Sequence, residues 1–185
     1  MHLEKSLEFL YLLLTEMIKK LLAGLITGMA LAVPGEARVE RGTIPLLDLM
    51  ESGGIAVRYN TSDCTSGEYL GLYRHRGMKR AMVLCPGATV DAEDHMVVRH
   101  EAIHAIQHCV NVARGTHIYT AIIDDDEELM QFARAHLSAE YIENIKHVYA
   151  PEEWRIEFEA FAGMHAFTAD ELAEMFTEAC IYTDA

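Results

Sequence analysis

The segment His100-Glu101-Ala102-Ile103-His104 constrains the fold of this chain more than any other. Residues four apart on an α-helix lie one turn apart on the same face, so the spacing predicts a helix that presents two imidazoles side by side. Two such imidazoles can reach one zinc ion, and Glu101 lies beside them where its carboxylate can accept a proton from a water molecule. The segment therefore predicts a metal-binding helix with His100 and His104 as ligands and Glu101 as the catalytic base.

Composition limits the class of protein around this helix. A chain of 185 residues is long enough for one domain with a substantial core. The net charge of −14 argues against a nucleic-acid partner, because no basic stripe is available to neutralise phosphates.

The N-terminal 37 residues read differently from the rest of the chain. Two lysines after Met17 precede the apolar run 21–33, and small residues follow it as far as Ala37. This order is typical of a secretory signal peptide with its start at Met17, and the apolar run is short for a stable membrane span. We expect residues 1–37 to be removed and the mature protein to be secreted or periplasmic. The alternative is a protein anchored in the membrane by its N-terminus.

Four cysteines follow the predicted signal: Cys64, Cys85, Cys109 and Cys180. An even number in an exported chain is compatible with two disulfides, and three pairings are possible. No Cys-x-x-Cys pair is present, so a thiolate zinc site is not indicated.

Residues 38–185 read as a single domain whose pattern changes near Pro86. Before this residue, β-branched and aromatic residues alternate with turn residues; after it the period is helical. The strands are expected at 54–60, 69–75 and 80–86, with a hairpin connection at 76–79. The helices are expected from Asp91 as cap to about Ala113, at 126–136, at 139–148 with Ser138 as cap, at 151–167 with Pro151 in the first turn, and from the capping box Thr168–Glu171 through about Tyr182. The pattern predicts an α+β fold: a small, mostly antiparallel sheet, then the HExxH helix and the C-terminal helices.

The ten residues around HExxH resemble the active-site helix of the zincin metallopeptidases. The flanks agree with this, since Val97 stands three residues before the first histidine and Ile106 two residues after the second. The resemblance implies a zincin-like fold, a Zn²⁺ cofactor and hydrolysis of peptide bonds in a peptide or protein substrate. The metzincin branch requires glycine at 107 and histidine at 110, whereas this chain has Gln107 and Val110. The resemblance is therefore to the gluzincin type, whose third ligand is a glutamate on a later helix.

Two glutamates in WRIEFEAFAG can supply that third ligand. Glu157 matches one gluzincin spacing and is favoured, while Glu159 matches another and is the alternative. The two point roughly opposite ways on a helix, so only one can face the histidines. In gluzincins an Asp or Asn usually follows this glutamate by four residues and often orients a ligand histidine. Here Phe161 and Gly163 occupy those positions, so no residue is assigned to orient the histidine ligands.

Other polar residues near these motifs have weaker support. His108 continues the face of His100 and His104, but a fourth protein ligand would close the site, so a role outside the metal shell is expected. Peptide hydrolysis needs a donor for the oxyanion, and Tyr149, His147 and His165 are the candidates near the glutamate helix.

Two functional hypotheses follow. The first is an exported zinc metallopeptidase in which His100, His104 and Glu157 hold Zn²⁺ and Glu101 is the general base. The second is a secreted metal-binding protein that keeps a zincin-like fold without cleaving peptides, which the short chain and the missing acidic residue favour to some extent.

Overall fold

The computed structural model describes residues 42–59, 61–66, 70–76, 79–85, 92–116 and 119–181. All of them belong to one compact unit, residues 40–185. The predicted signal peptide at residues 1–37, its start at Met17 and the predicted cap Asp91 lie outside the described residues. Among the described helices, none combines the length and the apolar character that crossing a bilayer requires.

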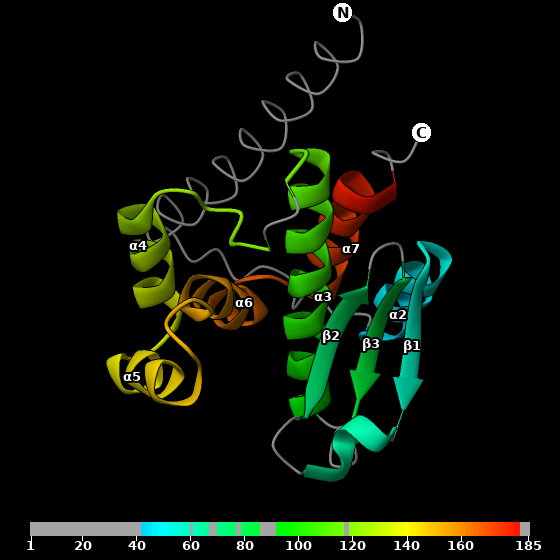
Figure 1. Ribbon diagram of the computed structural model, residues 1–185, viewed down its shortest axis with the longest axis horizontal. Helices are drawn as coiled ribbons and strands as arrows, with labels where there is room; N and C mark the ends of the chain where they lie inside the picture. The colour runs from blue at the N-terminus through cyan, green and yellow to red at the C-terminus, as the bar shows by residue number, and fades with distance from the viewer. Residues whose placement is uncertain are drawn as a thin grey trace, which may run out of the picture. The chain divides into compact units, whose positions relative to one another are not determined.

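The described residues form an α+β fold that is mostly helical (Figure 1). The elements, in chain order, are α2 (Ile44–Ser52), β1 (Ile55–Tyr59), the 3₁₀ helix η1 (Ser62–Ser66), β2 (Gly71–Arg76), β3 (Lys79–Leu84), α3 (Ala92–Ala113), α4 (Asp126–His136), α5 (Ala139–Val148), α6 (Trp154–Ala166), α7 (Ala169–Phe176) and the π-helical turn η2 (Thr177–Ile181).

Capping side chains explain why the helices of the C-terminal half begin where they were predicted to begin. Asp125 accepts from the backbone N–H of Glu128 at the start of α4, and Ser138 accepts from Tyr141 at the start of α5. Thr168 and Glu171 form the predicted capping box of α7. Each cap satisfies backbone donors that the first helical turn leaves without a partner.

Two details of the helix prediction were wrong. Residues 44–52 form a helix in a region where only strand signals were expected; a proline in its first turn starts it, and Leu46 and Met50, four apart, are its buried residues. Pro151 lies in a turn before α6 rather than in its first helical turn, since α6 begins at Trp154. The last helix extends to Ile181, close to its predicted end at about Tyr182, and its final turn from Thr177 is π-helical.

The sheet is mixed rather than mostly antiparallel. Its strand order is β1-β3-β2; β2 and β3 form the predicted antiparallel hairpin, whereas β1 and β3 pair in parallel. A parallel neighbour requires a long connection, and here η1 and β2 lie in the chain between the two strands. In this order β2 is an edge strand of the described sheet.

Helix α3 lies between the sheet and α6, and glycines permit both close approaches. An added Cβ at Gly71, the first residue of β2, would lie 2.6 Å from Cγ1 of Val97 on α3. An added Cβ at Gly163 on α6 would lie 2.6 Å from Cδ1 of Ile103. An added side chain at either position would force its neighbour to move, so these two glycines allow β2 and α6 to pack closely on the HExxH helix.

Two disulfides link elements that are distant in sequence. Cys64 of η1 is bonded to Cys85 after β3, and Cys109 of α3 is bonded to Cys180 of η2. Of the three pairings that the sequence left open, the structure has this one, and no cysteine is free.

Candidate metal centre

Three predicted ligands converge between α3 and α6. The Nε2 atoms of His100 and His104 are 3.0 Å apart. Oε2 of Glu157 lies 3.5 Å from Nε2 of His100, and Oε1 lies 3.4 Å from Nε2 of His104. The three side chains are between 9% and 12% exposed. This buried group could hold a metal ion.

The spacing and chemistry of the group fit zinc. In a tetrahedral site with Zn–N and Zn–O distances of about 2.0–2.1 Å, neighbouring ligand atoms lie roughly 3.3 Å apart, close to the separations found here. Two imidazoles and one carboxylate form a donor set of catalytic zinc sites, in which a fourth position stays open for water. Oε2 of Glu157 is buried without a hydrogen-bond partner among the described residues, as expected of a ligand oxygen whose full set of contacts includes an ion.

The ligands perturb one another electrostatically. Burial by itself would raise the pKa of Glu157, but the hydrogen bonds and charges of His100 and His104 lower it to about 2. Burial by itself would lower the pKa of His104, but the hydrogen bond and charge of Glu157 raise it to about 9. The carboxylate therefore stays ionised over the pH range in which His104 exchanges its proton for a metal ion.

Glu101 lies next to the ligands without belonging to their group. Its side chain is buried, its Oε2 has no hydrogen-bond partner among the described residues, and the backbone N–H of Tyr73 donates to the carboxylate. Burial raises the pKa of Glu101, while the neighbouring histidines oppose the rise. A carboxylate with a raised pKa and an unused oxygen is suited to accept and return a proton.

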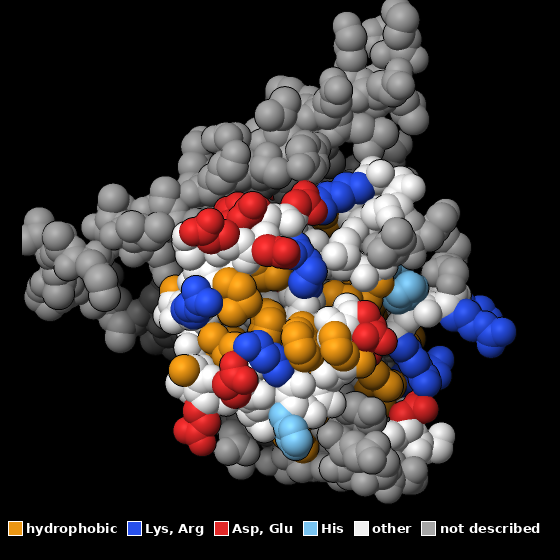
Figure 2. All heavy atoms as spheres, turned by 60° about the vertical axis from the view of Figure 1, so that its left-hand side comes forward, with side chains coloured by type: hydrophobic (Ala, Val, Ile, Leu, Met, Phe, Trp, Pro, Cys, Tyr) orange, Lys and Arg blue, Asp and Glu red, His pale blue; other side chains and the backbone are white. Residues whose placement is uncertain are grey.

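A cavity of about 710 Å³ opens onto these groups. The edge strand β2 forms one wall, and the end of α5 with the start of α6 forms the other. Figure 2 shows the face with α4 and α5 turned forward, where hydrophobic side chains gather in the middle and charged side chains surround them. The cavity is lined by Gly71, Leu72, Tyr73, His100, Glu101, His104, Tyr119, Val148, Tyr149, Glu153 and Glu157.

Glu159 does not reach the histidines. Its Oε2 accepts from the backbone N–H of Ile122 at 2.8 Å and from Nε2 of Gln107 at 2.8 Å, and its Oε1 accepts from the N–H of Ile123 at 2.8 Å. Glu157 and Glu159 thus point to different sides of α6, as the helical period requires. The structure brings Glu157, and not Glu159, within reach of the metal position.

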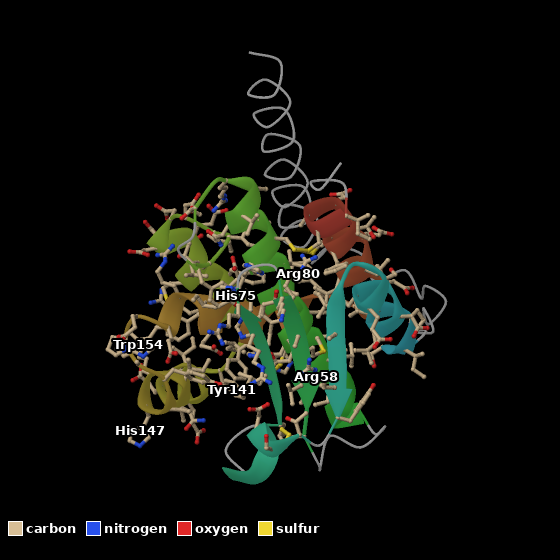
Figure 3. The ribbon with its side chains drawn as sticks, turned by 45° about the vertical axis from the view of Figure 1, so that its right-hand side comes forward. Arg58, His75, Arg80, Tyr141, His147 and Trp154 are labelled. Carbon is tan, nitrogen blue, oxygen red and sulfur yellow. A yellow bond between two sulfur atoms is a disulfide. The ribbon has the colours of Figure 1, made fainter. Side chains whose placement is uncertain are left out.

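Of the remaining predicted residues, some lie at the cavity and others lie away from it. Nδ1 of His108 forms a hydrogen bond with the Tyr73 hydroxyl at 2.8 Å, and the imidazole ring stacks on that of His75. His108 therefore lies outside the ligand group. Of the three candidate oxyanion donors, Tyr149 lines the cavity, whereas His147 and His165 are exposed and do not. Figure 3 shows His147 at the outer end of α5, pointing away from the rest of the molecule.

Two residues near the centre had no assigned role in the sequence prediction. Tyr119 lines the cavity and its hydroxyl donates to the backbone oxygen of His104 at 3.3 Å. Gln107 is fully buried, and its Oε1 lies 2.8 Å from Nδ1 of His104. The spacing of Gln107, three residues after His104 on one helix face, is a signal that could have indicated this contact. Tyr119 lies on a connecting segment with no periodic pattern, so no comparable signal exists for it.

Comparisons with protein families, with characterised proteins and with solved structures found no match to this chain.

Proposed function

We propose that this protein is an exported zinc metallopeptidase of gluzincin-like type. The observation that carries the proposal is the convergence of His100, His104 and Glu157, with Glu101 beside them, at a cavity bounded by an edge strand. The three converging side chains would hold the ion. Zinc bound there would supply Lewis acidity, which lowers the pKa of water to about 7 and polarises a carbonyl group.

Glu101 performs the proton transfers in this proposal. Its carboxylate accepts a proton from the attacking water as the water oxygen bonds to the carbonyl carbon of the peptide. It then delivers that proton to the amide nitrogen as the C–N bond breaks, so that a carboxylic acid and an amine leave. The buried position of Glu101 supports both steps, because burial raises the pKa of its carboxyl group and so makes the protonated form easier to reach.

The walls of the cavity support binding of an extended peptide. Gly71, Leu72 and Tyr73 line the cavity and belong to β2, which pairs with β3 along one side only among the described residues. A peptide can add to such an edge through main-chain hydrogen bonds. On the opposite wall, the Tyr149 hydroxyl is the donor best placed to approach an oxyanion, because it alone of the three candidates lines the cavity.

The proposal is tested by replacing the base while leaving the ligands in place. Glu101→Gln should keep one zinc ion per chain, measured by elemental analysis, and should lower the hydrolysis of labelled casein and of a mixed peptide library by about 10²–10⁴-fold. His104→Ala should lose the zinc itself. Glu140→Gln, which replaces an exposed carboxylate on α5, is the control and should retain both zinc and activity.

The outcomes separate the two hypotheses. If the wild-type protein binds zinc at these residues but cleaves none of the substrates, the non-catalytic metal-binding protein is favoured. If the wild-type protein neither contains nor takes up zinc, both hypotheses fail.

A further inference from the structure

We propose that Gln107 and Glu159 form a buried relay that positions His104 for metal binding, with Glu159 acting on the imidazole through the Gln107 side chain. The inference rests on the proposed function, because His104 is taken as a zinc ligand. It assigns a role to Glu159, the glutamate of EFE that does not face the metal position.

The contacts of Gln107 determine which way its amide points. Nε2 donates to the backbone oxygen of Ile156 at 3.1 Å and to Oε2 of Glu159 at 2.8 Å. With the amide nitrogen directed at two acceptors, Oε1 is the atom that faces Nδ1 of His104 at 2.8 Å.

This orientation selects one tautomer of His104. An amide oxygen can only accept, so Nδ1 of His104 carries the proton, and the lone pair of Nε2 is directed toward Glu157 and His100. The imidazole is thereby held with Nδ1 as the donor and in the ring orientation that coordination through Nε2 requires.

Glu159 holds Gln107 in this orientation. Its two oxygens accept from three N–H groups: the backbone of Ile122, the backbone of Ile123 and the Gln107 amide. Both oxygens therefore face N–H donors, which fixes the position of the carboxyl group. A flip of the Gln107 amide would place its oxygen against Oε2 of Glu159 and against the backbone oxygen of Ile156, and both hydrogen bonds would be lost.

Glu159 also binds the segment that carries Tyr119, a residue of the cavity lining. Ile122 and Ile123 follow Tyr119 on the segment that leads from α3 to α4, and the Tyr119 hydroxyl donates to Oε1 of Gln107 at 3.3 Å. Glu159 thus holds both the amide beneath His104 and the segment that brings Tyr119 to the cavity. No such support exists on the other ligand, since Nδ1 of His100 has no hydrogen-bond partner among the described residues.

Gln107 and Glu159 are buried, and the cost of burying polar side chains suggests that they serve the candidate metal centre. Gln107 is 0% exposed and Glu159 is 5% exposed. Burying an amide and a carboxylate is costly unless every contact is made, and apolar residues of similar volume would fill the same space.

Two variants and a matched control test the relay. Gln107→Met keeps the volume but removes all hydrogen bonds of the amide, and Glu159→Gln keeps the shape but replaces the carboxyl group by an amide. The control is Asn111→Leu: Asn111 is a buried amide on the same helix, and its Nδ2 donates to the backbone oxygens of Gln107 and Thr120 rather than to the relay side chains. Zinc affinity is measured by competition with a chromophoric chelator, with folding checked by circular dichroism.

Gln107→Met is expected to weaken zinc binding by about 10–100-fold and Glu159→Gln by about tenfold, while Asn111→Leu stays within about threefold of the wild type. A second readout follows the imidazole directly. In the Co²⁺-loaded wild type, one ligand histidine should show a slowly exchanging, paramagnetically shifted Nδ1–H proton, and this proton should exchange faster in Glu159→Gln.

The relay is overturned if both relay variants bind zinc as tightly as Asn111→Leu, or if the shifted proton exchanges equally fast in the wild type and in Glu159→Gln. Either result would leave the zinc site itself standing. By contrast, a wild-type protein that binds no zinc would overturn the proposed function, and the relay with it.

Discussion

Gly71 shows how one residue without a side chain positions the candidate base. It is the first residue of β2, and an added Cβ would lie 2.8 Å from Oε1 and 2.9 Å from Cγ of Glu101. It would also lie 2.6 Å from Cγ1 of Val97. The contact is too short for any side chain, so the backbone of β2 can approach Glu101 only where the strand carries glycine.

Gly71→Ala should therefore displace Glu101 while leaving the zinc ligands in place. Peptide hydrolysis is expected to fall by about 10–100-fold, because a shift on the order of 1 Å at a catalytic group has an effect of this size. Zinc content should stay at one ion per chain. The control is Gly115→Ala, which has a positive φ of 71° but open space around it; it should lower stability and leave kcat unchanged. Equal activity of Gly71→Ala and the wild type would contradict the role assigned to this contact.

At the scale of elements, α3 connects every part of the site. It carries His100, Glu101, His104 and Gln107, packs on β2 at Gly71, and meets α6 at Gly163. Its C-terminal half is also linked covalently to the C-terminal turn, since Cys109 is bonded to Cys180 of η2. The long helix therefore packs on β2 and α6 and is bonded to the C-terminal turn η2.

The two disulfides should differ in their contribution to stability. Cys109 and Cys180 are 71 residues apart, and Cys64 and Cys85 are 21 apart. Loop-closure entropy predicts that the longer link stabilises by about 4 kcal/mol and the shorter by about 3 kcal/mol. Urea denaturation of Cys109→Ala/Cys180→Ala and of Cys64→Ala/Cys85→Ala should show the larger loss in the first double variant. A larger loss in the second would show that packing around the 64–85 bond outweighs chain entropy.

At the scale of the whole molecule, the buried polar groups concentrate around one centre. The buried polar and charged residues are Thr43, His100, Glu101, His104, Gln107, Asn111 and Glu159. Except for Thr43, they lie on α3 or on α6, the two helices that carry the candidate metal centre. Since burial of such groups costs stability unless their contacts are complete, the bound ion should stabilise the entire fold.

Zinc removal tests this coupling. Free zinc at 100 times its dissociation constant stabilises the native state by about 2.7 kcal/mol, which corresponds to a Tm increase of roughly 5–10 °C for a chain of this length. A chelator should therefore lower the Tm of the wild type by that amount and leave the Tm of His104→Ala unchanged. If the two proteins respond equally to the chelator, the ion does not bind through His104.

A feature of the site could be predicted when the residues that determine it lie close together along the chain. The spacing of His100 and His104 and the caps at Asp125, Ser138 and Thr168 involve residues within about one helical turn, so the sequence contains them directly. The strand and helix signals were equally local, and they failed mainly at Ile44–Ser52, where a short helix follows a proline within a strand-rich region.

By itself, the sequence determined the helix that carries HExxH, the three strands and the α+β class, because each depends on the order of neighbouring residues. Only the tertiary structure decided that β1 pairs with β3 in parallel, that Cys109 bonds to Cys180, and that Glu157 rather than Glu159 faces the histidines. The choice of Glu157 depends on the rotation of α6 about its axis and on its approach to α3 at Gly163. Such long-range packing brings together residues about fifty positions apart, and no local pattern in the sequence records it.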